Sequence, residues 1–403
     1  MKQLSSQTFC AAPWFMIRND NQGHYRPCCA FESSNTDFNG DREYDRKSHS
    51  PVEWLDSDYM KYVRNNLYNN IELKECNECW SKESHGIVSH RQIYNQEILG
   101  DRDPSKTWVK NYFQHKPILD FGMVIWADIK TTNICNLSCA MCHPGDSSMI
   151  YTRWLRDTGN EFVLEYTKNN PDYFKKINNA YKQEVTVPIL DWVLEQSQLR
   201  IVKLLGGEPL LDKNLIDKLD KLDPDRKKNL TIMFVTNGTV DIATVVARLP
   251  GFKLLHFVVS VEGIGIVNDY IRKGSKWSVV EKNILQAQQL PGVQVSVAHT
   301  IQAITLPKFS ELLNWAQLHS LEISYNLLTS PEYLSINALD QYLIESIISD
   351  LPKNHPISNL LLQAKSDLHL KEKMLKYIQW YEEDSAIKLG NVCPELTGTN
   401  LQQ

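Results

Sequence analysis

The sequence predicts an α/β fold whose parallel sheet forms a barrel or part of one. Strand-like segments recur six times after residue 121, and most of them are near-continuous apolar runs. Such runs are typical of strands that are buried on both faces. Helical periodicity fills the gaps between the segments, and strand–helix repeats joined by right-handed crossovers give a parallel sheet.

Each predicted element rests on its own pattern. The predicted strands cover residues 123–132, 200–206, 230–238, 253–263, 293–302 and 321–328. After the second of them, Leu215, Leu219 and Leu222 repeat at the spacing of one helix face. Pro307 opens another apolar stripe and suits the first turn of a helix.

The chain divides into three predicted parts. Residues 1–115 are aromatic, polar and irregular, and the stretch GDRDPSKTW, which begins at residue 100, indicates a loop near their end. Residues 116–330 hold the strand–helix repeats, with a helical insertion at 143–199 that is rich in Tyr, Asn and Trp. Residues 331–403 are predicted to be a helical extension.

The composition excludes several classes of protein. With 42% hydrophobic and 23% charged residues, the 403-residue chain has the composition of an ordinary soluble globular protein, and its net charge of −5 argues against a generic nucleic-acid binder. Its start lacks the apolar core of a secretory signal, and no run approaches the ~18 apolar residues of a membrane helix, so we expect a cytoplasmic protein. Nine cysteines, an odd number, favour metal or cluster ligation over disulfides.

Three cysteines follow directly on the first predicted strand. Cys135, Cys139 and Cys142 lie in NICNLSCAMCHP, at the carboxyl end of a strand, where barrel-type sheets carry active sites. Three thiolates can ligate three irons of a cubane cluster and leave the fourth iron open, and an open metal position is typical of catalysis. The alternative is a zinc site with His143 as the fourth ligand.

The C-x3-C-x2-C spacing after the first strand of a partial barrel resembles the signature of the radical S-adenosylmethionine (SAM) enzymes. The resemblance implies a partial TIM-type (β/α)6 barrel and a [4Fe–4S] cluster on these cysteines. In this family SAM chelates the open iron, and one-electron reduction cleaves SAM to methionine and a 5′-deoxyadenosyl radical. Met141 stands where the family usually has an aromatic residue near the adenine.

A later segment, LLGGEPLL, resembles the GGE motif of the same family. It contains Gly206, Gly207, Glu208 and Pro209 at the end of the second predicted strand. In the family the backbone and the carboxylate of this motif contact the ammonium group of SAM, and glycines allow a backbone to approach a ligand closely. A glycine pair is also common in a simple strand-to-helix turn.

Further residues are assigned to the SAM pocket by position. Ser260 and Arg272, in VVSVEGIGIVNDYIRKG, are similar to the family residues that bind the SAM carboxylate, and the planar fork of Arg suits a carboxylate. The other predicted pocket residues lie at the ends of later strands and are Thr236, Asn237, Gln302 and Leu327.

Five more cysteines lie in the first 80 residues: Cys10, Cys28, Cys29, Cys76 and Cys79. The first three flank a predicted hairpin, and the pattern C-x2-PW … G-x3-PCC … C-x2-CW resembles the SPASM/twitch auxiliary modules of radical SAM proteins. Here the module precedes the barrel instead of following it. The resemblance implies one auxiliary [4Fe–4S] cluster, with Cys28 and Cys29 in competition, and a zinc ribbon is the alternative.

Three residues stay outside these motifs. Cys393, in NVCPEL, is interpreted as a free buried thiol or as a distant cluster ligand. His85 and His90, in SHGIVSH, are interpreted as ordinary loop or helix histidines, because their spacing suits no common zinc-binding helix.

The resemblance therefore predicts a radical SAM enzyme with one catalytic and one auxiliary cluster. Its substrate is expected to be a peptide or protein, with a small molecule such as a nucleoside, sugar or amino acid as the alternative. A flavodoxin- or ferredoxin-type reductase is the expected electron donor, and neither a membrane nor a nucleic acid is expected as a partner. A non-catalytic iron–sulfur or zinc protein is the other alternative, which the intact cysteines and Glu208 disfavour.

Overall fold

The computed structural model describes residues 8–20, 23–31, 49–99, 122–168, 171–182 and 186–397, so the predicted loop GDRDPSKTW lies outside the described residues. The chain forms two units. Unit 1 comprises Met1–Thr132, Lys175–Gly206 and Asp225–Met233, and unit 2 comprises Asn133–Phe174, Gly207–Pro224 and Phe234–Gln403. The domain boundaries predicted near residues 115 and 330 stay a prediction.

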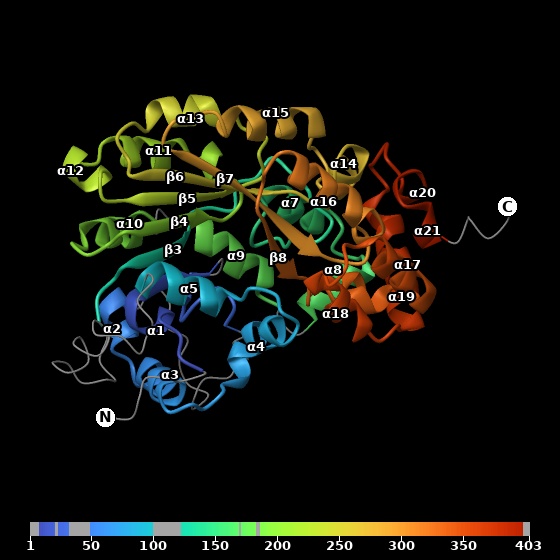
Figure 1. Cartoon of the computed structure of the whole chain (residues 1–403), viewed down its shortest axis with the longest axis horizontal. Helices are drawn as coiled ribbons and strands as arrows, with labels where there is room; N and C mark the ends of the chain where they lie inside the picture. The colour runs from blue at the N-terminus through green and yellow to red at the C-terminus, as the bar shows by residue number, and fades with distance from the viewer. Residues whose placement is uncertain are drawn as a thin grey trace. The chain divides into compact units, whose positions relative to one another are not determined.

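One sheet contains eight strands in the order β2–β1–β3–β4–β5–β6–β7–β8 (Figure 1). Neighbouring strands pair in parallel in β3–β4, β6–β7 and β7–β8. Six strands confirm the predicted ones, because each lies within the range of its apolar run; they are β3 (Trp126–Lys130), β4 (Ile201–Leu205), β5 (Thr231–Thr236), β6 (Leu254–Ser260), β7 (Val293–Ile301) and β8 (Ile323–Leu327).

The predicted hairpin near the start of the chain is present in unit 1. It consists of β1 (Met16–Asn19) and β2 (Tyr25–Arg26), which pair antiparallel. The sequence did not predict that β1 also pairs in parallel with β3, with Met16 opposite Trp126. All four residues of β1 are buried, so this strand is suited to the interior of a sheet.

Short helices of unit 1 pack around this hairpin. Tyr94 contacts Trp126 of β3 edge-on, with ring centroids 5.2 Å apart. Phe9 stacks on Trp14 at 5.1 Å. Such buried aromatic pairs supply much of the apolar contact in a small core. The helices before β3 are α1 (Ala12–Phe15), α2 (Pro51–Leu55), α3 (Asp58–Tyr68), α4 (Asn77–Ser84) and α5 (His90–Leu99).

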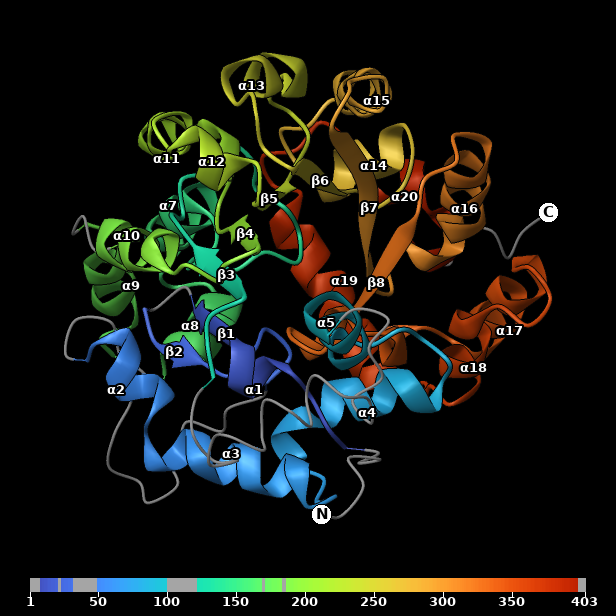
Figure 2. The same ribbon diagram turned by 60° about the vertical axis from the view of Figure 1, so that its left-hand side comes forward.

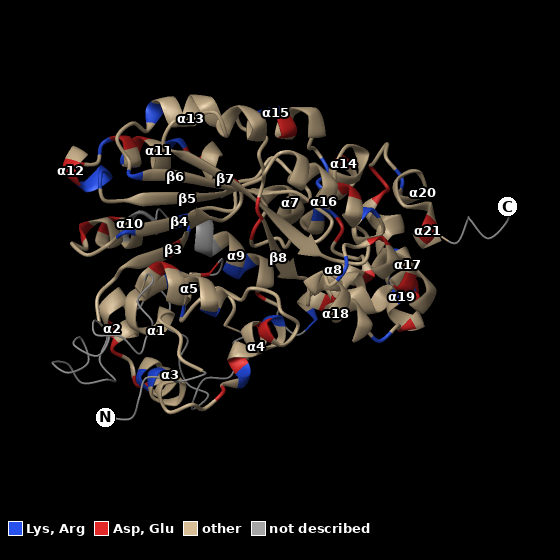
Figure 3. Ribbon diagram, viewed as in Figure 1, with Lys and Arg blue, Asp and Glu red and all other residues tan. Residues whose placement is uncertain are grey.

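In unit 2, helices alternate with the last three strands. Figure 2 shows α13 (Ile242–Arg248), α15 (Trp277–Ala287) and α16 (Phe309–Leu318) on the outer side of β6–β8. No charged residue occurs in β6 or β7, which are tan along their length in Figure 3. This distribution is expected for strands that are covered on both faces.

The remaining helices follow the predicted pattern. The insertion is helical and contains α7 (Ser148–Arg156), α8 (Glu161–Thr167), α9 (Tyr173–Lys182) and α10 (Thr186–Glu195). The helix α11 (Lys213–Asp220) follows β4, and α14 (Ile266–Ile271) follows β6. Between α11 and β5, α12 (Pro224–Lys227) is a single turn. The C-terminal helices are α17 (Gln341–Asp350), α18 (Pro356–Leu362), α19 (Leu368–Tyr381), α20 (Leu389–Val392) and α21 (Pro394–Thr397). Across the described ranges, none of the helices has both the length and the apolar character needed to cross a membrane.

A buried ion pair joins β1 to β3. Arg18 Nη1 donates to Asp128 Oδ2 at 2.7 Å, and the Asp128 side chain is fully buried. Removing one member of a buried pair leaves the other charge without compensation, which is far costlier than losing an exposed pair. The position of β1 in the sheet therefore depends on this contact.

We expect Asp128→Asn to lower the free energy of unfolding by about 3–5 kcal/mol, because Arg18 loses its counter-charge inside the sheet. Urea unfolding followed by circular dichroism measures the change. Asp225→Asn is the matched control, since Asp225 pairs with Lys228 at 2.9 Å on the surface, and it should cost no more than about 1 kcal/mol. Equal losses in the two variants would contradict the prediction.

Candidate functional site

The segment Asn133–Ser147, here called the cysteine loop, leads from β3 to α7 and carries three cysteines. Its backbone closes on itself: the N–H of Cys142 donates to the carbonyl of Cys139 at 3.1 Å. Ser147 Oγ donates to the carbonyl of Leu137 at 2.8 Å, and Ser147 also caps the start of α7. The three cysteines are therefore held on one compact loop.

The three thiols lie close enough to influence one another's charge. Burial raises the pKa of Cys142 well above its usual value, and negative charge on Cys139 and Cys135 raises it further. Burial raises the pKa of Cys139 to about 12, although Arg272 opposes the shift. A metal centre must displace these protons when it binds, so its affinity for the loop should rise with pH.

The two glycines of LLGGEPLL leave room for the backbone of the segment that precedes Cys135. A Cβ on Gly207 would lie 2.2 Å from the carbonyl oxygen of Ile134, and one on Gly206 would lie 2.3 Å from that of Thr132. The N–H of Glu208 donates to the same Ile134 carbonyl at 2.7 Å. The sequence predicts that these glycines admit a ligand, whereas the close approach in the structure is that of the chain's own backbone just before Cys135.

Glu208 is fixed by hydrogen bonds to the end of β5. Its Oε1 accepts from Thr236 Oγ1 at 2.8 Å and from the N–H of Leu210 at 3.1 Å, and its Oε2 accepts from the N–H of Asn237 at 2.6 Å. Burial raises the pKa of Glu208 to about 7 in spite of these donors. Oε2 retains one lone pair, so the carboxylate can accept one further hydrogen bond.

Asn237 connects the end of β5 to the cysteine loop. Its Nδ2 donates to Asn136 Oδ1 at 2.9 Å and lies 3.9 Å from Cys135 Sγ. The sequence placed Asn237 in the pocket only from its position at a strand end. In the structure it orients the first cysteine of the loop.

Arg272 is directed at the second cysteine. Its Nη2 donates to Glu262 Oε1 at 2.8 Å, and its Nη1 lies 3.9 Å from Cys139 Sγ. Glu262, which is 1% exposed, also accepts from the N–H of Thr300 at 3.0 Å. Glu262 was not predicted from the sequence, although it lies two residues after Ser260 and therefore on the same face of an extended segment.

The other predicted SAM residues of unit 2 lie at the carboxyl edge of the sheet or nearby. Ser260 ends β6, and Leu327 ends β8 opposite Ile301. Gln302 follows β7 and is fully buried, yet neither atom of its side-chain amide has a partner within the described ranges. Buried polar atoms of this kind usually have partners, so the amide is available to a ligand. Met141 is half-buried on the cysteine loop, and Pro209 is buried at the start of a short 3-10 helix.

Two tyrosines of α19 hold the cysteine loop from the C-terminal region. Tyr377 Oη donates to the carbonyl of Ala140. Tyr381 Oη lies 3.1 Å from the carbonyls of Ser138 and of Ile271, and can donate to one of them at a time. Sequence reasoning missed both, because no local pattern links residues more than 230 positions apart.

The five N-terminal cysteines influence one another in unit 1. Burial raises the pKa of Cys28, and charge on Cys29, Cys10, Cys79 and Cys76 raises it further. Burial likewise raises the pKa of Cys76 to about 12 and that of Cys79 to about 11. Residues from three separate stretches of sequence are therefore gathered at one place.

Cys29 differs from the other four in having a basic partner. Burial alone would raise its pKa, but the charge and hydrogen bond of His90, together with Lys203 and Arg18, lower it to about 6. Correspondingly, Cys29 is the main cause that raises the pKa of His90 to about 9, against the effect of burial. Cys29 Sγ also lies 3.0 Å from Tyr94 Oη. The sequence interpretation of His90 as an ordinary histidine missed this pair.

The two remaining candidate ligands have other partners. The imidazole of His143 forms a hydrogen bond with the hydroxyl of Tyr173 and packs edge-on against Trp154 at 6.2 Å. Cys393 is fully buried, and its Sγ donates to the carbonyl of Ile304 at 3.4 Å. All nine cysteines are free thiols. Among the residues that the structure describes, no three Cys, His, Asp or Glu side chains already stand as a metal site.

We expect Gly207→Ala to displace the cysteine loop, because its Cβ would overlap the Ile134 carbonyl. The variant should lose about 2 kcal/mol or more of unfolding free energy and most of the iron bound after anaerobic reconstitution. Gly159→Ala is the matched control, since no atom lies within 4 Å of a Cβ there. Normal iron content in Gly207→Ala would show that the close approach is not required.

In metal-free protein, Cys29 should react with iodoacetamide at pH 7 faster than Cys10, Cys28, Cys76 or Cys79. A thiol whose pKa is lowered to about 6 is largely thiolate at pH 7, and this fraction is lost as the pH falls through 6. His90→Asn should slow the alkylation of Cys29 about tenfold by removing the positive charge. Peptide mapping by mass spectrometry gives the rates, and equal labelling of all five cysteines would contradict the assignment.

Comparison with known proteins matches residues 129–311 to the Radical SAM superfamily. The uncharacterized protein MJ0907 of Methanocaldococcus jannaschii is 26% identical over 211 residues, which cover 50% of this chain and 61% of that protein. The match therefore spans less than two thirds of the relative's length.

Two solved structures also match parts of the chain. The structure of anSMEcpe with bound AdoMet is 16% identical with a TM-score of 0.40, covering 61% of this chain and 64% of that one. SuiB of Streptococcus suis, bound to S-adenosylmethionine, is 14% identical with a TM-score of 0.32, covering 84% and 57%. The superfamily match includes the whole cysteine loop, Glu208 and Arg272, so the chain is similar to radical SAM proteins over the part that carries these residues.

Proposed function

We propose that Cys135, Cys139 and Cys142 hold a [4Fe–4S] cluster and that SAM binds at the iron they leave open. The observation that carries this proposal is the meeting of three thiols with Arg272 and Glu208 in unit 2. Arg272 lies 3.9 Å from Cys139 Sγ, and its charge favours the thiolate that an iron ligand must be. The engagement of the His143 imidazole by Tyr173 favours this proposal over a zinc site completed by His143.

The residues around the loop suit the polar groups of SAM. Glu262 orients the Arg272 guanidinium, and the Arg272 Nε–H has no partner in the described part of the chain, so a carboxylate can accept from it. The remaining lone pair of Glu208 Oε2 can accept from an ammonium group. The unpartnered amide of Gln302 offers both a donor and an acceptor.

Held by the three cysteines, the cluster together with SAM would supply reductive one-electron cleavage and hydrogen-atom abstraction from the substrate. The chain's own residues orient the reactants. Tyr377 holds the Ala140 carbonyl of the cysteine loop, Tyr381 can donate to the Ser138 carbonyl, and the Asn237 amide lies 3.9 Å from the first cysteine. Such positioning contributes to the rate because the reacting atoms are held close together.

We further propose one auxiliary cluster in unit 1, ligated by Cys10, Cys76, Cys79 and either Cys28 or Cys29. The mutual influence of these thiols supports the set. Cys28 and Cys29 compete for the fourth position, and the thiolate of Cys29 is the one that His90 stabilises. Zinc on the same thiols is the alternative. Metal analysis of the reconstituted protein distinguishes the two.

The substrate we propose is a peptide or protein, because the N-terminal cysteine pattern resembles modules that accompany oxidative peptide maturation. A small molecule is the second candidate. A gene for a short peptide beside this one favours the first, and a biosynthetic operon favours the second. The electron is expected from a flavodoxin- or ferredoxin-type protein.

With dithionite as reductant, the wild-type protein should form 5′-deoxyadenosine from SAM, and Cys139→Ala should lose more than about 99% of this activity, because one ligand of the cluster is gone. Liquid chromatography of the nucleoside products measures it. Cys393→Ala is the matched control, since that thiol is buried outside the loop, and it should retain activity. Equal activity in wild type and Cys139→Ala would rule out the proposed chemistry.

Iron counting tests the number of clusters independently of turnover. A variant with Cys135, Cys139 and Cys142 all changed to Ala should keep about four irons and four sulfides per chain. Zinc in place of that iron would remove the auxiliary cluster from the proposal and leave the catalytic one.

A further inference from the structure

Residues 261–262 follow β6 in unit 2 and carry the carboxylate that orients Arg272. The N–H of Val261 donates to the carbonyl of Ala298 in β7 at 2.9 Å. The N–H of Glu262 donates to Asn268 Oδ1 of α14 at 3.2 Å. The main chain of this short segment is therefore tied to β7 on one side and to α14 on the other.

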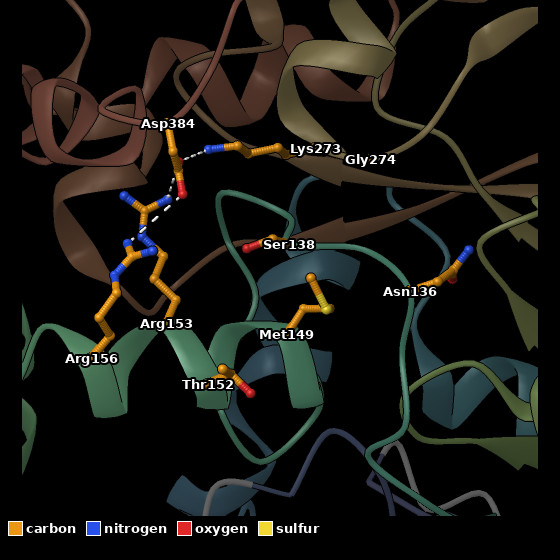
Figure 4. Close-up of a pocket in the computed structure, with 9 residues that line it drawn as sticks. All are labelled: Asn136, Ser138, Met149, Thr152, Arg153, Arg156, Lys273, Gly274 and Asp384. Carbon is orange, nitrogen blue, oxygen red and sulfur yellow. Dashed lines mark hydrogen bonds and ion pairs between the residues drawn. The ribbon is translucent and has the colours of Figure 1, made fainter.

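The main chain around Arg272 is held by other contacts. Its N–H donates to the carbonyl of Asn268 at 2.8 Å. The side chain of the next residue, Lys273, is directed away and pairs with Asp384 (Figure 4). Because these contacts fix the backbone, the direction of the Arg272 guanidinium depends on its 2.8 Å ion pair with Glu262.

His299 of β7 lies beside this pair and is fully buried. Its Nδ1 is 3.1 Å from the carbonyl oxygen of Val261, and Nδ1 must carry the hydrogen, since a carbonyl can only accept. The same Nδ1 lies 3.6 Å from Glu262 Oε2. The ring stacks on Phe309 of α16, with centroids 4.9 Å apart. The imidazole is therefore fixed against the residue that precedes Glu262.

The surroundings of Nε2 keep the His299 imidazole neutral. This atom is buried and has no hydrogen-bond partner among the residues that the structure describes. A second proton would place an N–H there without an acceptor, which is costly in the interior. Burial lowers the pKa of His299, although Glu262 and the Val261 carbonyl oppose the shift. A neutral His299 does not compete with Arg272 for the charge of Glu262.

We propose that His299 is a positioning residue for the binding of SAM. Its N–H holds the Val261 carbonyl and thereby the turn that carries Glu262, and its neutrality leaves the Glu262 charge to Arg272. The Arg272 Nε–H, which has no partner in the described part of the chain, then stays available to a ligand carboxylate. This inference rests on the proposed SAM site. Residues behind the groups that contact a ligand commonly act in this indirect way.

SAM affinity tests the proposal on the anaerobically reconstituted protein. The dissociation constant is measured by isothermal titration calorimetry for wild type, His299→Leu and His299→Asn. The leucine removes the donor, and we expect it to raise the Kd about tenfold. The asparagine keeps a donor at the place of Nδ1, so its Kd should stay within about threefold of wild type. Iron content should equal that of wild type in both variants.

His355→Leu is the matched control. His355 contacts the same Phe309 ring, with centroids 5.9 Å apart. Its Nδ1 accepts from the N–H of Ile357 at 3.3 Å and so serves α18 instead of the segment after β6. This variant should bind SAM within about twofold of wild type.

A double substitution shows whether His299 acts through the arginine. Arg272→Gln should weaken SAM binding by itself, and adding His299→Leu to it should weaken binding no further, because the group that His299 positions is already gone. General damage to the core would instead lower the affinity in either background. If His299→Leu does not fold, His299→Met gives the same comparison with His299→Asn.

The outcomes separate this inference from the proposed function. Wild-type affinity in His299→Leu, equal losses in the leucine and asparagine variants, or a further loss on top of Arg272→Gln overturns the positioning role. A wild type that does not bind SAM overturns it as well. SAM binding that depends on His299 but yields no 5′-deoxyadenosine with dithionite supports the positioning role and counts against the proposed function.

Discussion

The contact between the backbones at Gly207 and Ile134 is the constraint on which the rest of the site depends. There is no room for a Cβ on Gly207, because it would lie 2.2 Å from the Ile134 carbonyl oxygen. The N–H of Glu208 donates to the same carbonyl. Cys135 is the residue after Ile134. Glu208 is the residue after Gly207, and its carboxylate accepts a hydrogen bond from the N–H of Asn237, just after β5. This close approach therefore fixes the positions of Cys135, the Glu208 carboxylate and Asn237 relative to one another. Because the interior is closely packed, displacing one of them displaces the others.

Three charged pairs of the described chain each join two separate elements near the cysteines. Arg18 of β1 pairs with Asp128 of β3. Glu262, after β6, pairs with Arg272, after α14. The third pair links the Cys29 thiol to His90 of α5. Buried pairs add little net stability compared with apolar packing, so we interpret their role as fixing the position of the loops that carry cysteines.

Sequence patterns predicted the elements better than the contacts between them. Apolar runs located all six strands from β3 to β8, and cysteine spacing located the loop, because both signals are local. Glu262 could have been predicted, because in an extended segment it lies on the same face as Ser260. Three contacts have no local signal: β1 beside β3, His90 beside Cys29, and the tyrosines of α19 on the cysteine loop. The reason for the two glycines was also different from the predicted one, because spacing cannot tell a ligand from a neighbouring backbone.

The hydroxyl bond from Tyr377 to the Ala140 carbonyl spans 237 positions of sequence, which has a consequence for the order of assembly. A ribosome that adds roughly 5–20 residues per second makes the cysteine loop roughly 10–50 s before the helix that supports it. Throughout that interval the thiols belong to a nascent chain whose loop lacks its C-terminal support. During that interval the loop is therefore held only by contacts with segments that have already been synthesised, and its final arrangement is completed only when α19 packs against it.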